Sequence, residues 1–310
     1  MNNANKTQVD VFELSGLTDD REFAPFLFIF FLLVYMITVC GNIGIIAVVQ
    51  ISPSLHTPMY YFLSYLSVVD LLYSSVVTPK MLSDLLSDKK FISFVGCALQ
   101  FYFYVALAIT ESLLLSTMSY DRYVAICQPL CYVSIMTKKR CLNLILLVFK
   151  VGCLQSVVQT SCIFTLEYCG PNFINHFYCD GPPLFKLSCS DTFWCDLIAF
   201  FFVSSCGIGS MVTVLSSYSL IVASILRMKS AEGRQKAFST CSSHIMCISI
   251  FYGTVFFIYL RPPTAAFDKK DKVASVFYTV MIPMLNPLIY SLRNQEVRKI
   301  LRKTIHKSHQ

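Results

Sequence analysis

Uncharged stretches long enough to cross a lipid bilayer recur along this chain and constrain its fold more than any other feature. From Phe23 to Ile51 there is no charged residue, and about 20 apolar residues suffice for a membrane-spanning helix. Hydrophobic residues make up 55% of the sequence and charged residues only 14%, which excludes an ordinary soluble protein. The chain is therefore predicted to be an all-α membrane protein.

Further apolar stretches follow, and together with the first they predict a seven-transmembrane helix bundle. The predicted spans cover residues 23–51, 59–86, 94–127, 142–164, 196–228, 236–260 and 273–292. Residues 1–22 are expected to form an extracellular tail, residues 23–293 the bundle, and residues 294–310 a short interfacial helix and cytoplasmic tail. This last segment places apolar residues on one helical face and basic residues elsewhere, which is typical of a helix in the membrane interface.

The basic residues indicate the orientation of the bundle. More of the 25 Lys and Arg fall in segments predicted to be cytoplasmic than in segments predicted outside. By the positive-inside rule the amino terminus is extracellular and the carboxyl terminus cytoplasmic, in a multi-pass protein of the plasma membrane. Asn5 then lies in a usable glycosylation sequon, Asn5-Lys6-Thr7. The net positive charge is not gathered on a soluble face, so nucleic acid is not an expected partner. Membrane lipid is an expected partner of a chain with this many spans.

The third predicted span ends in the stretch Met118–Cys127, which carries an acid and a base side by side. An arginine in mid-membrane is costly, so Arg122 is expected where the span meets water, neutralised by Asp121. The triplet Asp121-Arg122-Tyr123 alone is equally compatible with an ordinary ion pair at a helix end.

Three further stretches carry a family resemblance together with Met118–Cys127. They are Leu55–Leu63 at the first inner turn, Lys236–His244 at the start of the sixth span and Pro283–Asn294 at the end of the seventh. With these motifs the chain resembles the olfactory receptors, a branch of the rhodopsin-like (class A) G-protein-coupled receptors, over nearly its whole length. It departs from the family pattern at Tyr61, where phenylalanine is usual, and mildly at Ser242.

The resemblance implies an odorant receptor that activates a stimulatory, olfactory-type heterotrimeric G protein and raises cyclic AMP. The residues assigned to coupling lie at the inner ends of the helices: Asp121, Arg122, Tyr123, Tyr218, Lys236 and Tyr290. One alternative is a non-olfactory chemosensory receptor of the same fold. A second is a membrane transporter. Internal repeats are expected of many transporters, and the sequence shows none, so this alternative is less favoured. No nucleophile–base set and no common catalytic motif occurs, so the chain is not expected to be an enzyme.

Two acids and an asparagine are predicted to meet near the middle of the bilayer. Counted from the inner ends of their helices, Asp70 lies about 18 Å deep and Glu111 about 16 Å deep at 1.5 Å per residue. Asn286 falls in the same inner half. Two neighbouring carboxylates repel unless a cation or a proton lies between them, so the cluster is either a sodium site or a protonated, hydrogen-bonded pair. The resemblance implies sodium, and no other cofactor is expected.

The 14 cysteines divide between the two sides of the membrane. Disulfides can persist in the predicted outer segments, but the sequence leaves their pairing open. The resemblance implies one bond between Cys97 and Cys179 and another between Cys169 and Cys189. Cys195 is then expected to be unpaired at the outer end of the fifth span, and cysteines within the spans are expected to be small packing residues.

A ligand cavity is expected in the outer half of the bundle. Helical spacing selects residues on one face each of the third and sixth spans: Tyr104, Ala108, Tyr252, Val255 and Tyr259. Further lining positions rest on the family resemblance: Val105, Ile109, Ser112, Phe202, Cys206, Val276 and Thr279. None of these residues is charged, although each aromatic ring is equally compatible with plain interhelical packing. The lining favours a small, mostly apolar ligand with one hydrogen-bonding group.

Lys150 fits none of these assignments. It lies about eight residues, or roughly 12 Å, inside the predicted fourth span, deeper than a lysine side chain easily reaches water. Either the fourth helix begins later than expected, or Lys150 faces a partner inside the bundle.

Overall fold

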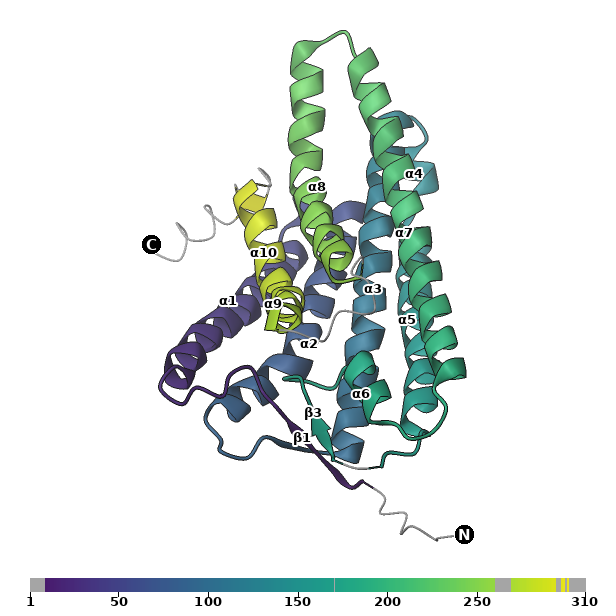
Figure 1. Cartoon of the computed structure of the whole chain (residues 1–310). Helices are drawn as coiled ribbons and strands as arrows, with labels where there is room; N and C mark the ends of the chain where they lie inside the picture. The colour runs from purple at the N-terminus through teal and green to yellow at the C-terminus, as the bar shows by residue number, and fades with distance from the viewer. Residues whose placement is uncertain (1–8, 170, 260–268, 294–296, 299, 301–310) are drawn as a thin grey trace.

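The computed structural model of the chain describes residues 9–169, 171–259, 269–293, 297, 298 and 300. Long helices run alongside one another, with a small sheet at one end of the molecule and the turn between α7 and α8 at the other (Figure 1). The longer helices are α1 (Ala24–Ile51), α2 (Pro58–Leu85), α3 (Phe94–Cys127), α5 (Lys138–Phe164), α7 (Phe193–Arg227), α8 (Ala231–Tyr259) and α10 (Ile282–Arg293). The short helices between them are α4 (Tyr132–Ile135), α6 (Gly181–Leu187) and α9 (Lys269–Val276).

Within the described residues, six helical segments are long and apolar enough to cross a membrane, and α8 adds the shorter apolar stretch Cys241–Val255. The last of the six runs from Lys272 to Ser291, because α9, a π-helix at Phe277–Met281 and α10 follow one another without a break. The predicted seven-helix membrane bundle is therefore confirmed. The π-helix, with its wider turn, was not indicated by the sequence.

Side-chain caps explain where two of the spans begin. Ser93 Oγ accepts a hydrogen bond from the Gly96 amide at 3.1 Å, and α3 starts at the predicted residue, Phe94. Thr137 Oγ1 accepts from the Arg140 amide at 3.3 Å, so α5 starts at Lys138. The predicted start of the fourth span at residue 142 was therefore four residues too late, because a capped first turn can carry the basic side chains of residues 138–140.

α5 approaches α3 closely at Gly152, which is buried against the Ala106–Thr110 turn. A Cβ atom at this position would lie 2.6 Å from the Ala106 carbonyl oxygen, a distance that side chains do not tolerate. The Thr110 hydroxyl, which donates to that same carbonyl at 2.7 Å, is also within the space a Cβ would need. Glycine therefore allows the two helices to pack backbone against backbone.

A three-stranded sheet covers the outer end of the bundle, with strand order β2–β1–β3 (Figure 1). The middle strand β1 (Val11–Leu14) pairs antiparallel with β2 (Phe91–Ser93) and parallel with β3 (Phe173–Ile174). Phe12 and Leu14 alternate inward and are 1% exposed, so the strand closes an apolar cluster beneath it. The sequence indicated no strand in this part of the chain.

Two lysines tie the residues after β1 to distant parts of the bundle. Lys90 Nζ donates to the carbonyl oxygens of Ser15 and Thr18, both at 2.9 Å. Lys272 Nζ donates to Ser15 Oγ at 2.7 Å. The amino-terminal segment therefore contacts the α2–α3 loop and the start of the seventh span.

Three disulfides join the outer segments of the described chain. Cys97–Cys179 and Cys169–Cys189 are the two predicted pairs. The third bond joins Cys195 to Cys162, so the prediction of an unpaired Cys195 was wrong. Cys162 lies in the last turn of α5 and Cys195 in the first turn of α7, with their Cα atoms 5.6 Å apart. Cys162 is thus a cross-link and not a packing residue.

Replacing Cys162 or Cys195 by serine is expected to lower the stability of the outer half by about 2–4 kcal/mol, because the bond closes a loop between two spans. The measurement is the thermal unfolding midpoint of the purified protein, followed with a thiol-reactive dye. Cys153→Ser, which changes an exposed free cysteine of the same helix, is the matched control. Equal midpoints for all variants would mean that the bond does not form in the folded protein.

Lys150 lies on the exposed side of α5. Both explanations offered by the sequence were wrong, because α5 begins earlier than predicted and the lysine points away from the bundle. Asn5 and most of the predicted interfacial helix lie outside the described residues, as do the side chains of Lys236 and Tyr259.

Candidate functional site

Tyr104 of α3 lies where three apolar clusters meet. Its ring stacks on Tyr73 of α2 with centroids 5.6 Å apart, and it lies 5.0 Å from the ring of Tyr178. The Tyr178 hydroxyl donates to the Tyr104 hydroxyl at 3.2 Å. Tyr178 precedes the disulfide-bonded Cys179, so the long outer loop reaches down to a residue predicted to line the cavity. The sequence did not single out Tyr178.

Three hydroxyl groups from three helices form a buried polar cluster deeper in the bundle. Ser112 Oγ lies 3.0 Å from Ser210 Oγ of α7 and 3.4 Å from the Tyr252 hydroxyl of α8. All three residues are buried. Ser112 and Tyr252 were both predicted to line the cavity, and the structure brings them together across 140 residues of sequence. Ser210 was missed, although it stands one helical turn beyond Cys206, a predicted lining residue.

The other predicted lining residues of α3, and Cys206 of α7, make separate contacts within the bundle. Val105 is buried in the cluster beneath the sheet, and Ile109 packs against that cluster. Ala108 packs against the central core. Gln155 of α5 donates its side-chain amide to Cys206 Sγ at 2.9 Å, which joins α5 to α7. These positions remain predicted ligand contacts.

The remaining predicted positions differ in burial. Phe202 is half-buried and its ring lies against Phe201 on the same helix. Val255 is half-buried and packs against the large cluster that includes Leu114 of α3. Val276 packs against a second cluster, which includes Val77 and Met81 of α2. Thr279 is buried in the π-helix, where its hydroxyl donates to a carbonyl of the preceding turn at 2.8 Å. Tyr259 ends α8, and its side chain lies outside the described part.

Asp70, Glu111 and Asn286 come together, as the depth arithmetic predicted. The Asn286 side-chain amide donates to both Asp70 oxygens, at 3.2 and 3.0 Å. Glu111 lies within electrostatic reach of Asp70. It is 1% exposed, and neither of its carboxylate oxygens has a hydrogen-bond partner. Asn42, whose amide donates to the Pro283 carbonyl at 3.1 Å, also has a buried side-chain oxygen without a partner. Buried acceptors without donors are costly, so the group suits a small cation or a proton.

No group of three or more His, Cys, Asp or Glu that could hold a metal occurs in the described residues. A cation at this position would therefore depend on two carboxylates and neutral oxygens. Such a donor set fits a hard, weakly bound ion such as sodium better than a transition metal, which prefers imidazole or thiolate.

At the inner end of α3, Arg122 pairs with Asp121 within one turn. The guanidinium donates to Asp121 Oδ2 through Nη2 at 2.8 Å and through Nε at 3.2 Å. Asp121 is fully buried and Arg122 is 12% exposed, so the pair is more shielded from water than predicted. Tyr132 of α4 donates its hydroxyl to the other carboxylate oxygen at 2.9 Å. Burial and the Asp121 carboxylate raise the pKa of Tyr132 above its ordinary value, which keeps this donor protonated.

Tyr218 of α7 and His244 of α8 join the inner ends of their helices. The Tyr218 hydroxyl lies 2.7 Å from His244 Nδ1. His244 was quoted in a family motif but not predicted as a coupling residue. The Tyr123 hydroxyl accepts a hydrogen bond from the side-chain amide of Gln128, just after α3, at 3.3 Å. Tyr290 is buried. The predicted coupling residues thus take part in three separate contacts in this structure: Arg122 with Asp121, Tyr218 with His244, and Tyr123 with Gln128.

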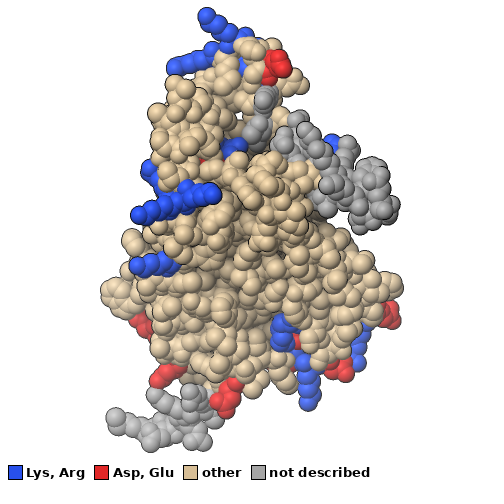
Figure 2. All heavy atoms as spheres, turned by 180° about the vertical axis from the view of Figure 1, so that it is seen from behind, with Lys and Arg blue, Asp and Glu red and all other residues tan. Residues whose placement is uncertain are grey.

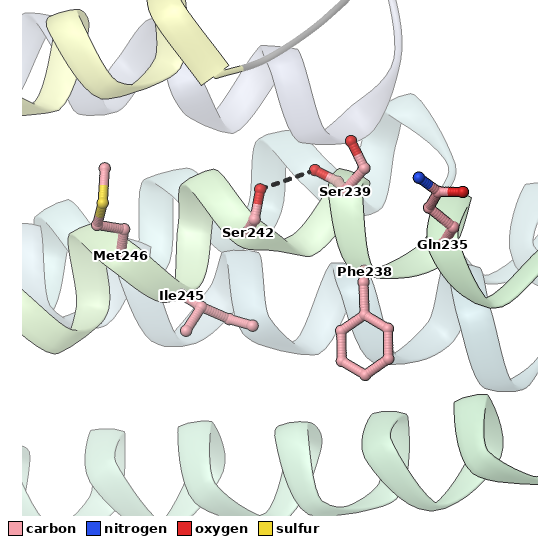
Figure 3. Close-up of a pocket in the computed structure, with 6 residues that line it drawn as sticks. All are labelled: Gln235, Phe238, Ser239, Ser242, Ile245 and Met246. Carbon is pink, nitrogen blue, oxygen red and sulfur yellow. Dashed lines mark hydrogen bonds between the residues drawn. The ribbon is translucent and has the colours of Figure 1, made fainter.

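A groove of about 470 Å³ lies along the inner half of α8. It is lined by Gln235, Phe238, Ser239, Ser242, Ile245 and Met246. Figure 3 shows Phe238 and Ile245 pointing to one side of the helix and Ser242 and Met246 to the other. The Ser242 hydroxyl donates to the Ser239 carbonyl at 3.0 Å, so it is satisfied within the helix. What faces the groove is therefore mostly apolar.

Two titratable groups, the buried His176 and the half-buried Asp180, lie in the outer loop beside Cys179. Burial, together with the Lys272 ammonium, lowers the pKa of His176 to about 3, so its ring is neutral at physiological pH. Asp180 caps α6 by accepting a hydrogen bond from the Gly181 amide at 2.9 Å. Burial raises the pKa of Asp180 to about 6, so mild acid protonates it. Neither was predicted as a site residue.

The chain is similar to known proteins of one family. A family model described as "Olfactory receptor" matches residues 31–308. The chain is 51% identical to olfactory receptor 5F1 of Homo sapiens over 305 residues, covering 98% of this chain and 97% of that protein. It is 51% identical to olfactory receptor 5AP2 of Mus musculus over 304 residues, covering 98% and 96%. It is 49% identical to the olfactory receptor-like protein COR4 of Gallus gallus over 305 residues, covering 98% of each.

The crystal structure of squid rhodopsin is similar in fold. It superposes with a TM-score of 0.68 at 17% sequence identity, over 93% of this chain and 87% of that one. At this identity the likeness shows a common helix arrangement and nothing about the ligand.

Proposed function

Because this chain belongs to the olfactory receptor family, we propose that it is an odorant receptor for a small, mostly apolar volatile with one hydrogen-bonding group. Membership of a receptor family, with a rhodopsin-like fold, also means that the chain is not an enzyme. The ligand is proposed to bind in the outer half of the bundle and to activate a stimulatory G protein that raises cyclic AMP.

The observation that carries this ligand class is the buried hydroxyl cluster of Ser112, Ser210 and Tyr252 within an otherwise uncharged lining. Neutral hydroxyls can donate to or accept from one polar group of a ligand, but they cannot neutralise an ammonium or a carboxylate. The rings of Tyr104 and Tyr252 offer apolar area to the remainder of the molecule. A charged ligand would leave its charge unpaired there, at a high desolvation cost.

The direct test is a cyclic AMP reporter screen in cells that express the full chain, with a broad panel of volatiles. Neutral oxygenated molecules are expected among the agonists, and amines and free acids are not. A panel in which only charged compounds elicit a response would contradict the proposed ligand class.

Tyr252→Phe is expected to weaken the response to an oxygenated agonist about two- to twelve-fold, because one hydrogen bond to a neutral ligand contributes about 0.5–1.5 kcal/mol. Ser112 keeps its 3.0 Å contact with Ser210, so the substitution leaves little unsatisfied. A hydrocarbon agonist of the same shape is the control, and the variant's response to it should equal that of the parent receptor. Val255→Trp should block both ligands by filling the cavity. Equal shifts for both ligands in Tyr252→Phe would place the polar contact elsewhere.

The inner acids are proposed to hold a sodium ion that biases the bundle toward one packing of its helices. Two unpartnered Glu111 oxygens beside Asp70 support this, since a cation would offset both charges. The ion would act only by neutralising these two carboxylates, which changes the free energy of packing their helices together.

Asp70→Asn and Glu111→Gln are each expected to reduce the sodium dependence of basal cyclic AMP. Because Asn286 and the two acids form one buried network, the double variant should cost less than the sum of the single effects. Potassium chloride at matched ionic strength separates a specific sodium effect from charge screening. Strict additivity in this double-mutant cycle would mean that the two acids do not act on a shared ion.

The G protein is proposed to engage the inner face, at the groove along α8. This groove lies near His244 of the same helix, which contacts Tyr218 of α7. An apolar groove beside a helix suits the amphipathic helix of a partner. The amino terminus is accordingly proposed to lie outside the cell, with Asn5 as a glycosylation site, in a receptor of the plasma membrane. Digestion of Asn5→Gln with an N-glycosidase on intact cells tests the orientation, since only the parent chain should change in mass.

A further inference from the structure

Lys150 is a cation on the outward face of α5, midway along a membrane span. No hydrogen bond or ion pair of the described residues involves its ammonium group, and its side chain is exposed. At about 100° per residue, Lys150 stands nearly opposite the buried residues Ile145 and Val148. It therefore faces the lipid and not the interior of the receptor.

Two polar residues nearer the inner end share this face. Lys139 and Asn143 lie within about 40° of Lys150 around the helix, and all three are exposed. Lys138 and Arg140 flank Lys139 in the first turn, so the strip is basic where it meets the cytoplasmic interface. In the view from behind, Lys and Arg side chains stand on the flank to which α5 belongs, with uncharged surface around them (Figure 2).

The direction of the helix brings these groups closer together than their spacing suggests. Lys150 is 11 residues, or about 16 Å, beyond Lys139 along the axis. Side chains of an α-helix point back toward its amino terminus, which for α5 is the inner end. A lysine stem of about 6 Å therefore carries the ammonium toward the headgroup region, where it can meet a phosphate that dips below the surface.

The surroundings suit a lipid better than a second copy of this chain. Exposed Leu146, Leu147 and Leu154 flank Lys150 on the same face and can contact acyl chains. Asp70, Asp84, Glu111 and Asp121 are buried within the spans. The exposed described acids of the long helices, Asp196 and Glu232, lie in the first turns of α7 and α8, so another copy would present no carboxylate at the depth of Lys150. Opposite charge must then come from the membrane, whose cytoplasmic leaflet carries anionic headgroups.

We propose that the inner half of α5 binds one anionic glycerophospholipid, with its phosphate at Lys150 and Asn143 and its headgroup at Lys138–Arg140. The bound lipid neutralises a charge that otherwise faces hydrocarbon. It also fixes the depth at which α5 sits in the bilayer, and α5 packs directly on α3 at Gly152. The site therefore links membrane composition to the central helix of the receptor.

The test is a titration of the purified full chain, in mixed micelles with phosphatidylcholine, against fluorescent phosphatidylserine followed by anisotropy. Lys150→Met is expected to raise the apparent Kd about fivefold, the equivalent of about 1 kcal/mol for one lysine near the membrane surface. Lys150→Arg should restore binding. Lys229→Met, which removes an exposed inner lysine between α7 and α8, is the matched control and should change nothing. The thermal midpoint of each variant confirms that it is folded.

Three results would overturn the proposal. Equal affinity of Lys150→Met and the parent for phosphatidylserine would remove the lysine from the site. Displacement of the lipid by soluble glycerophosphoserine at similar concentrations would mean that the strip binds a free phosphate and not a lipid. A change in oligomeric mass in Lys150→Met, with unchanged lipid affinity, would assign this face to a second copy of the receptor.

Discussion

An Arg122→Ala receptor is expected to reach the cell surface, to bind its agonist and to give no cyclic AMP response. The guanidinium is held by Asp121 at the inner end of α3, far from the Ser112–Tyr252 cluster, so its removal should spare the ligand. The same removal leaves a fully buried Asp121 carboxylate with the Tyr132 hydroxyl as its remaining donor. The inner face then lacks its shielded cation, and an uncompensated charge disturbs the local packing.

A matched variant separates coupling from folding. Asp121→Asn keeps one acceptor oxygen in place of two and removes the negative charge that holds the guanidinium, so basal cyclic AMP is expected to rise. Surface labelling of intact cells, read alongside the reporter, corrects both variants for expression. A surface-expressed Arg122→Ala receptor that signals like the parent would show that this ion pair has no part in coupling.

Cys97→Ser and Cys179→Ser are each expected to abolish surface expression. Both cysteines are fully buried, and the bond closes a separation of 82 residues. Loss of such a disulfide costs about 2–5 kcal/mol, which is a large part of a total stability of about 5–15 kcal/mol. The bond also holds the Cys179 amide where it donates to Gln100 Oε1 at 3.0 Å, and it keeps Tyr178 against Tyr104.

The control for this experiment is Cys40→Ser, because Cys40 is free and exposed on α1. Flow cytometry of an amino-terminal tag measures the surface fraction, and a total-protein blot distinguishes retention from poor synthesis. Normal surface levels together with a full response in either Cys97→Ser or Cys179→Ser would mean that the loop is ordered without its cross-link.

The sequence was informative where one physical rule dominates. Long uncharged runs must become helices in a bilayer, since every backbone amide needs a partner there, so the bundle and the bounds of α3 were predictable. A fixed rise per residue converts sequence position into depth, and this was enough to predict that Asp70 and Glu111 meet. Helical spacing selected Tyr252, whereas Ser112, which it meets, was selected by the family resemblance.

Features that depend on where two distant segments end could not be predicted. The end of the fourth span at residue 164 was predicted, but nothing near Cys162 indicates that this end of α5 meets Cys195. The β1 strand is only four residues long, and its partners are remote in sequence. His244 meets Tyr218 because α7 and α8 happen to align in register, which neither helix encodes alone. The interpretation of Lys150 was wrong because a charge within a span can face lipid as well as the interior.

The position of β1 between β2 and β3 sets an order of events during synthesis. Asn172 donates its side-chain amide to the Val11 carbonyl at 2.6 Å across 161 residues of sequence, just ahead of β3. At translation rates of about 5–20 residues per second, the first strand leaves the ribosome roughly 8–32 s before these partners exist. The sheet that covers the outer end, which contains the first-made strand, can therefore be completed only after α1, α2, α3 and α5 have been synthesised. A chain arrested before residue 173 keeps that strand incompletely paired, with backbone groups available to other chains.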